Sequence, residues 1–131
     1  MISAQYRFRG RSSLNYVYRS GQTIRGPLFS VKYALNPRRT SYRAAVVVSK
    51  KVHKSAFGRN RMRRRLYELI RQQQPSISQP YDIVVTVFHD TVLTATSQEL
   101  SQQLKKQFKM AGITRRAKNS DPPTGRQVSE L

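Results

Sequence analysis

Apolar residues of this chain occur in short strand-like runs and in longer stretches with helical spacing. In LFSVKYAL (28–35) apolar side chains alternate with polar ones, which predicts a strand with one apolar face. The runs YRAAVVVS (42–49) and YDIVVTVF (81–88) are more continuously apolar, as in strands from the interior of a sheet. A shorter strand is expected at 22–25. The pattern therefore predicts a small sheet.

Three other segments have the spacing of amphipathic helices. The first starts after Ser12 or Ser13 as its N-cap and ends at Gly21, a residue type common just past helix ends. Its apolar positions are Leu14, Val17 and Tyr18. The second starts after Ser55. Its buried face is expected to consist of Met62, Leu66, Leu69 and Ile70.

The third helix opens with Thr96 and Glu99, the two residues of a capping box, and stops at Gly112. Its apolar positions are Leu100, Leu104, Phe108 and Ala111. The order of elements is thus α-β-β-β-α-β-α. This order predicts an α+β fold, a two-layer sandwich of a small mixed four-stranded sheet with helices.

The ends of the chain differ from its centre in composition. Residues 1–11 alternate aromatic and basic groups without a helical or strand period, which predicts a mobile basic arm. Residues 113–131 have almost no apolar content and are expected to be disordered. The domain itself is expected to span 12–112.

The second helix carries a dense cationic face. Opposite its apolar stripe, the expected outer residues are Asn60, Arg61, Arg64, Tyr67, Glu68 and Arg71. Arg63 and Arg65 flank the stripe. Most charge runs are only solvated helix faces, but such faces usually mix both signs. This face has one acid, so it favours binding to a polyanion.

The net charge further limits the classes of binding partner. The 131 residues carry a formal charge of +19, with a pI near 11.4, which implies a partner rich in phosphate or an anionic membrane surface. The chain has no cysteine, so no disulfide framework is possible. No apolar run approaches the length of a membrane span, and the N-terminus lacks a signal-peptide core. We expect a soluble protein of the cytoplasm that needs no membrane.

Catalytic side chains are scarce. His53 lies between lysines, where a solvated or phosphate-facing role is expected rather than that of a general base. His89 and Asp90 follow a strand and are expected to belong to a turn in which Asp90 accepts local hydrogen bonds. No glycine-rich phosphate loop or metalloprotease motif is present. The chain alone is therefore not expected to be an enzyme.

One motif is more specific than the rest. VSKK (48–51), followed seven residues later by RNRMRRRLYE (59–68), resembles the signature of the bacterial ribonuclease P protein component. The opening helix with Gly21, the strand at 81–88 and the closing helix are similar to that family in the same order. The resemblance covers residues from about Arg7 to Gly112.

This resemblance implies a subunit of ribonuclease P, an endoribonuclease in which a catalytic RNA, with Mg²⁺ held mainly by that RNA, removes the 5′ leader of precursor tRNA. It implies a fold like domain 2 of ribosomal protein S5, with a left-handed crossover through the basic helix. No catalytic or metal-binding residue and no obligate protein partner are implied for the protein. The implied RNA-docking residues are Lys50, Lys51, Arg59, Asn60, Arg61, Arg63 and Arg64. The implied cleft for the precursor tRNA leader comprises Leu14, Tyr18, Ser30 and Lys32.

Three positions depart from the family pattern. Tyr67 stands where the family often has arginine, Arg65 occupies a commonly apolar position, and Leu14 replaces a usual aromatic residue. Two other classes of protein fit the composition. A ribosomal or other structural RNA-binding protein is the main alternative, and a DNA-compacting protein is a weaker one.

Overall fold

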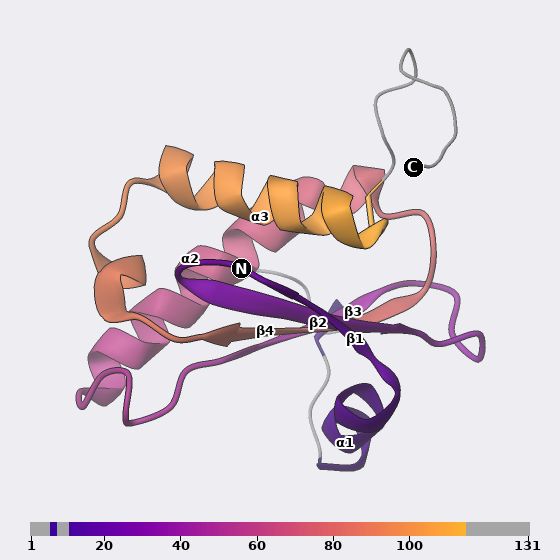
Figure 1. The fold of residues 1–131 in the computed structure, drawn as a ribbon, viewed down its shortest axis with the longest axis horizontal. Helices are drawn as coiled ribbons and strands as arrows, with labels where there is room; N and C mark the ends of the chain where they lie inside the picture. Colours follow the sequence, from indigo (N-terminus) through magenta and orange to yellow (C-terminus); the bar gives the residue numbers. More distant parts are fainter. Residues whose placement is uncertain (1–5, 8–10, 115–131) are drawn as a thin grey trace.

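The computed structural model describes residues 6, 7 and 11–114 (Figure 1). Within them, three helices and four strands follow one another in the order expected from the sequence. Their bounds are α1 Arg11–Ser20, β1 Gln22–Arg25, β2 Phe29–Leu35, β3 Arg43–Val47, α2 Ala56–Gln73, β4 Tyr81–Val87 and α3 Ser97–Ala111. Two short 3₁₀ helices, η2 Gln74–Ser76 and η3 Asp90–Leu93, lie on either side of β4 along the chain.

The four strands form one mixed sheet in the order β1-β2-β4-β3. Strand β2 is antiparallel to both β1 and β4, whereas β3 runs parallel to β4. A parallel neighbour requires a crossover connection, and α2 supplies it. The mixed four-stranded sheet and the α+β class are thus confirmed. The left-handed sense of the crossover stays a prediction.

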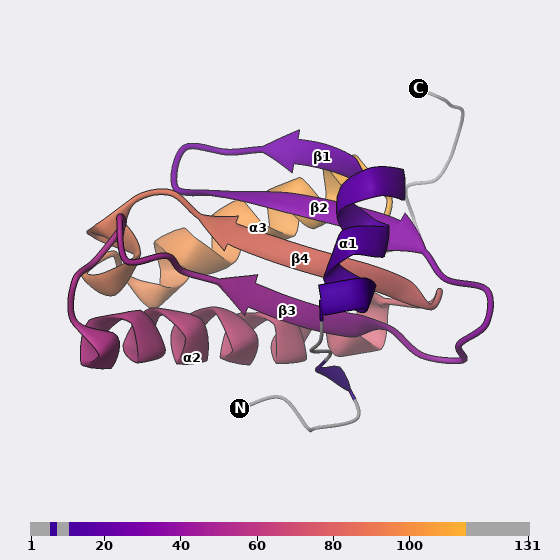
Figure 2. The same cartoon turned by 90° about the horizontal axis from the view of Figure 1, so that it is seen from below.

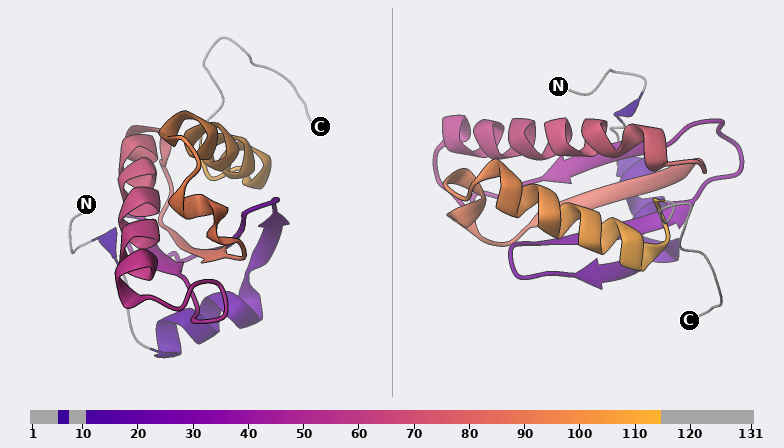
Figure 3. Two further views of the ribbon diagram at one scale, coloured as in Figure 1. Left: turned by 90° about the vertical axis from the view of Figure 1, so that its left-hand side faces the viewer. Right: turned by 90° about the horizontal axis from the view of Figure 1, so that it is seen from above.

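Helices cover both faces of the sheet, as Figures 1 and 2 show: α2 and α3 lie on one face, and α1 crosses the other. The large core fills the space under α2 and α3, and a small cluster around Val17 packs α1 against Ala45 and Val84. The short α1 therefore adds a partial third layer to the expected two-layer sandwich. Figure 3 shows α2 and α3 side by side on their face.

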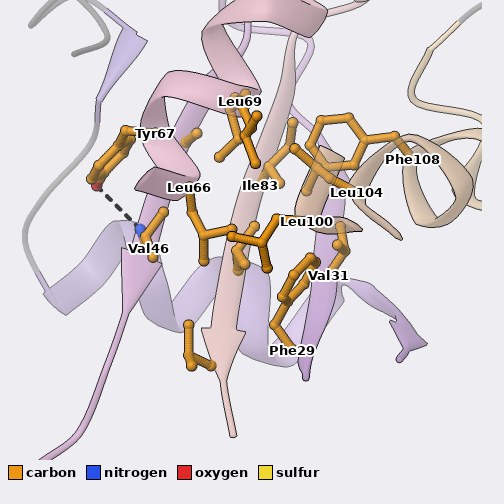
Figure 4. Packing of buried hydrophobic residues seen from close by; sticks show 14 of the residues in the cluster. Phe29, Val31, Val46, Leu66, Tyr67, Leu69, Ile83, Leu100, Leu104 and Phe108 are labelled. Carbon is orange, nitrogen blue, oxygen red and sulfur yellow. Dashed lines mark hydrogen bonds between the residues drawn. The ribbon is translucent and has the colours of Figure 1, made fainter. Parts of the chain in front are cut away.

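Apolar spacing explains the large core. The side chains with no exposed surface there include Phe29, Val31, Met62, Leu66, Ile70, Ile83, Val85, Leu100, Leu104 and Phe108 (Figure 4). They come from alternate positions of β2 and β4 and from the stripes expected on the second and third helices. Burial of such side chains contributes about 1.5–3 kcal/mol each.

The expected helix ends are largely confirmed. The Ser55 side chain accepts a hydrogen bond from the Gly58 nitrogen, and Thr96 and Glu99 form both bonds of a capping box. Gly112 ends α3 with φ of 80°, a left-handed conformation that favours glycine. The start of α1 differs, because that helix begins at Arg11 rather than after Ser12 or Ser13.

The ends of the domain extend beyond the expected bounds. Tyr6 stacks on Tyr42 with ring centroids 4.9 Å apart, and Arg7 forms a parallel bridge with Ala44 at the outer edge of β3. Part of the predicted mobile arm is therefore bound to the sheet. At the other end Ile113 is buried and Thr114 bridges to Ile77. The remaining predictions for the arm and for the tail, residues 115–131, lie outside the described residues.

Candidate nucleic-acid interface

Helix α2 is seated by its apolar stripe, as the sequence analysis predicted. Met62, Leu66 and Ile70 have no exposed surface, and Leu69 is buried beside them. Tyr67 was expected on the outer face, and this prediction is wrong: its side chain is 8% exposed. Its hydroxyl accepts a hydrogen bond from the Val46 nitrogen on β3. The exposed face of α2 is therefore narrower than helical spacing predicts, because Tyr67 is not part of it.

The lysine pair lies in the loop that leads into α2. Lys50 and Lys51 are both exposed. The loop is held by Arg59, whose Nη1 donates hydrogen bonds to the carbonyls of His53 at 2.9 Å and Lys54 at 2.7 Å. Arg59 therefore braces the loop that carries the lysines. Its predicted contact with RNA stays a prediction.

His53 has a structural place that the sequence did not indicate. Its half-buried ring packs against the first turn of α2, where Gly58 leaves room for it. A β-carbon added at Gly58 would lie 2.3 Å from the imidazole carbon Cδ2 and nitrogen Nε2. The ring of His53 is therefore not fully solvated, because it fills a gap beside the helix. The alternative, a phosphate-facing role, stays a prediction.

The outer face of α2 holds two arginines without an acidic partner among the described residues. Arg61 and Arg64 are exposed, and neither forms an ion pair with the described part of the chain. Arg63 is less free, because its Nη2 donates to the Asn60 side-chain oxygen at 2.6 Å. Asn60, Arg61 and Arg64 are exposed, as expected for the outer face, whereas Arg63 is only partly exposed.

Glu68 and Arg71 neutralise each other further along α2. Arg71 donates hydrogen bonds to both carboxylate oxygens of Glu68 and forms an ion pair with it. This hydrogen bonding lowers the pKa of Glu68 to about 2. Arg61 and Arg64 remain exposed arginines of α2 without an ion pair to the described part of the chain.

Arg65 points the other way. Its guanidinium donates to the carbonyls of Val92, Leu93 and Ala95, at 2.7, 3.0 and 2.5 Å. Burial, and secondarily the charge of Arg61, lowers the pKa of Arg65. Arg65 therefore ties α2 to the segment before α3. It adds little to the outer face.

The predicted leader residues lie on the face of the sheet that α1 only partly covers (Figure 2). Lys32 pairs across strands with Val84, which packs against Val17 of α1, so Lys32 and α1 share this face. The Lys32 ammonium donates to the Thr23 hydroxyl at 3.1 Å. Tyr18 on α1 is 45% exposed.

The other two predicted leader residues are less accessible. Leu14 is half-buried against the Val17 cluster, and Ser30 is 7% exposed. All four predicted residues thus belong to α1 or to the sheet face beside it, but Tyr18 and Lys32 present more surface. Their contact with a leader stays a prediction.

Sequence reasoning missed two residues on this face. Arg25 pairs with Ser30 across β1 and β2, and its guanidinium carbon lies 5.1 Å from the centre of the Phe88 ring. Both side chains are exposed. Strand alternation places Phe88 on the same face as Val84, but only the register of β1 brings Arg25 to it.

Other polar groups have structural partners. The Asp82 carboxylate, which is fully buried, accepts a two-pronged bond from Arg43, with both distances 2.9 Å, and a third bond from Asn36 at 3.0 Å. His89 Nδ1 accepts from the Thr91 nitrogen at 3.1 Å and so caps η3. The self-satisfied turn is confirmed, although its acceptor is His89 rather than Asp90.

The described residues contain no group of three or more histidine, cysteine or acidic side chains that fits a metal ion. Asp82 is engaged by Arg43 and Asn36, so its oxygens do not form an open ligand set. In the same part of the chain, no helix combines the length and apolar character that crossing a bilayer requires.

Comparisons with known proteins agree with the motif and the fold. Residues 2–112 match the family model described as Ribonuclease P. The ribonuclease P protein component of Pseudanabaena sp. is 39% identical over 106 residues, spanning 80% of this chain and 90% of that protein. That of an Exiguobacterium species is 30% identical over 112 residues, spanning 86% and 95%.

Solved structures agree on the fold. The Staphylococcus aureus RNase P protein superposes with a TM-score of 0.75 at 23% identity, covering 84% of this chain and 98% of that one. The fold is therefore shared even where the sequences have diverged. This chain belongs to the family of bacterial ribonuclease P protein components, the protein subunits of a tRNA-processing endoribonuclease.

Proposed function

We propose that this protein binds the catalytic RNA of ribonuclease P through α2 and the loop before it, and the 5′ leader of precursor tRNA through the sheet face beside α1. In the assembled enzyme it assists hydrolysis that leaves a mature tRNA 5′ end. The observation that carries the proposal is the pair of exposed, unneutralised arginines, Arg61 and Arg64, on a helix anchored by a buried stripe.

Electrostatics supports the first part. Arg61 and Arg64 lie three residues apart on one helix and repel each other, which costs a few tenths of a kcal/mol in the free protein. An RNA backbone removes this repulsion and releases condensed counterions, which favours binding. Lys50 and Lys51 extend the cationic surface at the start of the helix.

The sheet face supports the second part. A leader is unpaired, so its bases can stack on aromatic side chains while basic groups bind its phosphates. Tyr18 and Lys32 offer these two kinds of group on one face. The Arg25 and Phe88 pair continues the same chemistry toward β1.

The protein supplies binding and charge neutralisation, and hydrolysis belongs to the RNA. The Mg²⁺ that the family implies would be held mainly by the catalytic RNA. No step of the reaction is assigned to a side chain of this protein. We propose the cytoplasm as its location, where precursor tRNA is processed.

Reconstitution tests the function directly. The protein is added at low Mg²⁺ to transcribed ribonuclease P RNA from Pseudanabaena sp., with a precursor tRNA that carries a 5′ leader. We expect restored cleavage at the mature 5′ end by the mixture and none by the protein alone. Cleavage by the protein alone, or no stimulation of the RNA, would contradict the proposal.

Matched variants test the assigned surface. Arg61→Ala with Arg64→Ala removes two positive charges from the outer face of α2. Lys105→Ala with Lys106→Ala removes two from exposed positions of α3. We expect the first pair to weaken RNA assembly and to lower the slope of log affinity against log salt by about 2. Equal losses from both pairs would mean that net charge alone controls binding.

The leader surface needs its own readout. Tyr18→Ala and Lys32→Ala should weaken binding of precursor tRNA to the assembled enzyme while leaving binding of mature tRNA unchanged. An equal loss for both RNAs would indicate that these residues do not contact the leader.

A further inference from the structure

Phe57 is the most exposed of the large apolar side chains in the described part of the chain. It stands in the first turn of α2 with 73% of its surface exposed. It belongs to neither apolar cluster, so the fold does not use it. The start of the helix is already capped by Ser55, so the ring is not needed there either.

The neighbours of Phe57 on the helix surface are one polar residue and two arginines without an acidic partner among the described residues. Asn60, Arg61 and Arg64 follow it by three, four and seven residues, spacings that place side chains on one side of a helix. Arg61 and Arg64 lie roughly 6 and 10 Å further along the axis. All three are exposed. The ring is therefore the aromatic end of the cationic surface.

Charge argues against another copy of this chain as the partner. A symmetric contact through Phe57 would bring Arg61 and Arg64 of two molecules together, and each molecule carries +19. An apolar protein groove would bury the ring but leave both guanidinium groups without an anion. Single-stranded RNA offers a flat base and flanking phosphates together.

We propose that Phe57 is a stacking platform for an unpaired base of the catalytic RNA, with Arg61 and Arg64 binding phosphates next to that base. The inference rests on the proposed function and adds a specific contact to it. Base stacking on an aromatic side chain is worth about five- to a hundredfold in affinity. Stacking involves no counterion release, so its loss should not change the salt dependence.

A single tryptophan provides a direct test, because the chain contains none. Phe57→Trp keeps the ring at an exposed position, and Met110→Trp places one at a 63% exposed site on α3 as the control. Both are titrated with the ribonuclease P RNA of Pseudanabaena sp. We expect strong quenching of the Phe57→Trp fluorescence by the RNA and little change for Met110→Trp.

Affinities provide the second readout. Phe57→Ala should weaken RNA binding about five- to a hundredfold with an unchanged salt slope, whereas Arg64→Ala should lower that slope by about 1. Phe57→Tyr should restore most of the loss, and Met110→Ala should have no effect. Thermal unfolding of Phe57→Ala is expected to match the wild type, since the ring is exposed.

The outcomes separate this inference from the proposed function. If Phe57→Ala binds RNA like the wild type and Phe57→Trp is not quenched, while the wild type still assembles and stimulates cleavage, the stacking contact is refuted and the function stands. If the wild type itself does not bind the RNA, the proposed function fails and the contact fails with it.

Discussion

The hydroxyl oxygen of Tyr67 lies 3.1 Å from the backbone nitrogen of Val46 and accepts its hydrogen bond (Figure 4). Strand β3 is the edge of the sheet, where backbone donors that face outward have no neighbouring strand. The Arg7 bridge to Ala44 covers another part of the same edge. Tyr67 thus covers part of this sheet edge with a side chain.

Removing that hydroxyl should destabilise the fold. Tyr67→Phe leaves the Val46 N–H buried without its partner, which costs about 1–3 kcal/mol in the free energy of unfolding. Chemical denaturation measures this loss in the free energy of unfolding. The control is Tyr16→Phe, whose hydroxyl donates to the Leu35 carbonyl at 3.0 Å at an exposed position and should cost less. Equal losses would show that burial of the Val46 donor is unimportant.

Arg65 and Arg64 are adjacent in sequence but have different roles. Substitutions at Arg65 should affect stability, and substitutions at Arg64 should affect RNA binding. Arg65→Met removes the hydrogen bonds to three carbonyls and should lower the free energy of unfolding by about 1.5–3 kcal/mol. It should leave the salt slope of RNA binding unchanged. Arg64→Met should leave the free energy of unfolding unchanged and lower the salt slope of RNA binding. Thermal unfolding and the salt dependence of RNA binding are measured for both variants. If Arg65→Met changed the salt slope more than Arg64→Met does, the structural role of Arg65 would be refuted.

Gln107 joins α3 to the adjacent ends of β1 and β2. Its side-chain nitrogen donates to the carbonyls of Ile24 at 3.0 Å and Phe29 at 3.1 Å, and it is 3% exposed. Gln107→Leu should cost about 1–3 kcal/mol, and Gln107→Glu more, because a carboxylate would face two carbonyl oxygens.

Gln102 is the matched control for this prediction, since it lies exposed on the same helix. Gln102→Leu should change the free energy of unfolding by no more than about 0.5 kcal/mol. A Gln107→Glu variant as stable as Gln102→Leu would show that the two carbonyls do not depend on the amide.

The pKa of Glu68 should show whether Arg71 donates hydrogen bonds to it. The hydrogen bonds from Arg71 hold the pKa of Glu68 at about 2, below the ordinary value of ~4.3. A depressed pKa means that the pair stabilises the fold above the unfolded pKa and that this contribution disappears as the pH falls through about 2. Because the pair is exposed, its contribution to stability is small.

Arg71→Gln should therefore raise the pKa of Glu68 toward ~4.3, as followed by NMR of the carboxyl carbon against pH. Arg64→Gln removes the same charge one turn before Glu68 on α2 and should shift the Glu68 pKa less. An unmoved Glu68 pKa in Arg71→Gln would show that Arg71 does not cause the depression.

Local patterns in the sequence were enough to place the helices and strands. The caps at Ser55, Thr96 and Gly112 depend on a few neighbouring residues, so they are readable without tertiary contacts. The alternation in β2 likewise placed Lys32 on the face opposite the large core. The same locality explains why the family motif in α2 could be recognised directly.

The sequence by itself determined that α2 is a buried-stripe helix with many cations, but not which cations are free. That was decided by backbone carbonyls elsewhere: Arg65 reaches residues 27–30 positions away, whereas Arg61 and Arg64 have no acidic partner among the described residues. Tyr67 points inward because of another distant backbone group: its hydroxyl accepts a hydrogen bond from the Val46 nitrogen on β3. Helical spacing sets the direction of a side chain; packing against distant segments determines whether it remains available to a ligand.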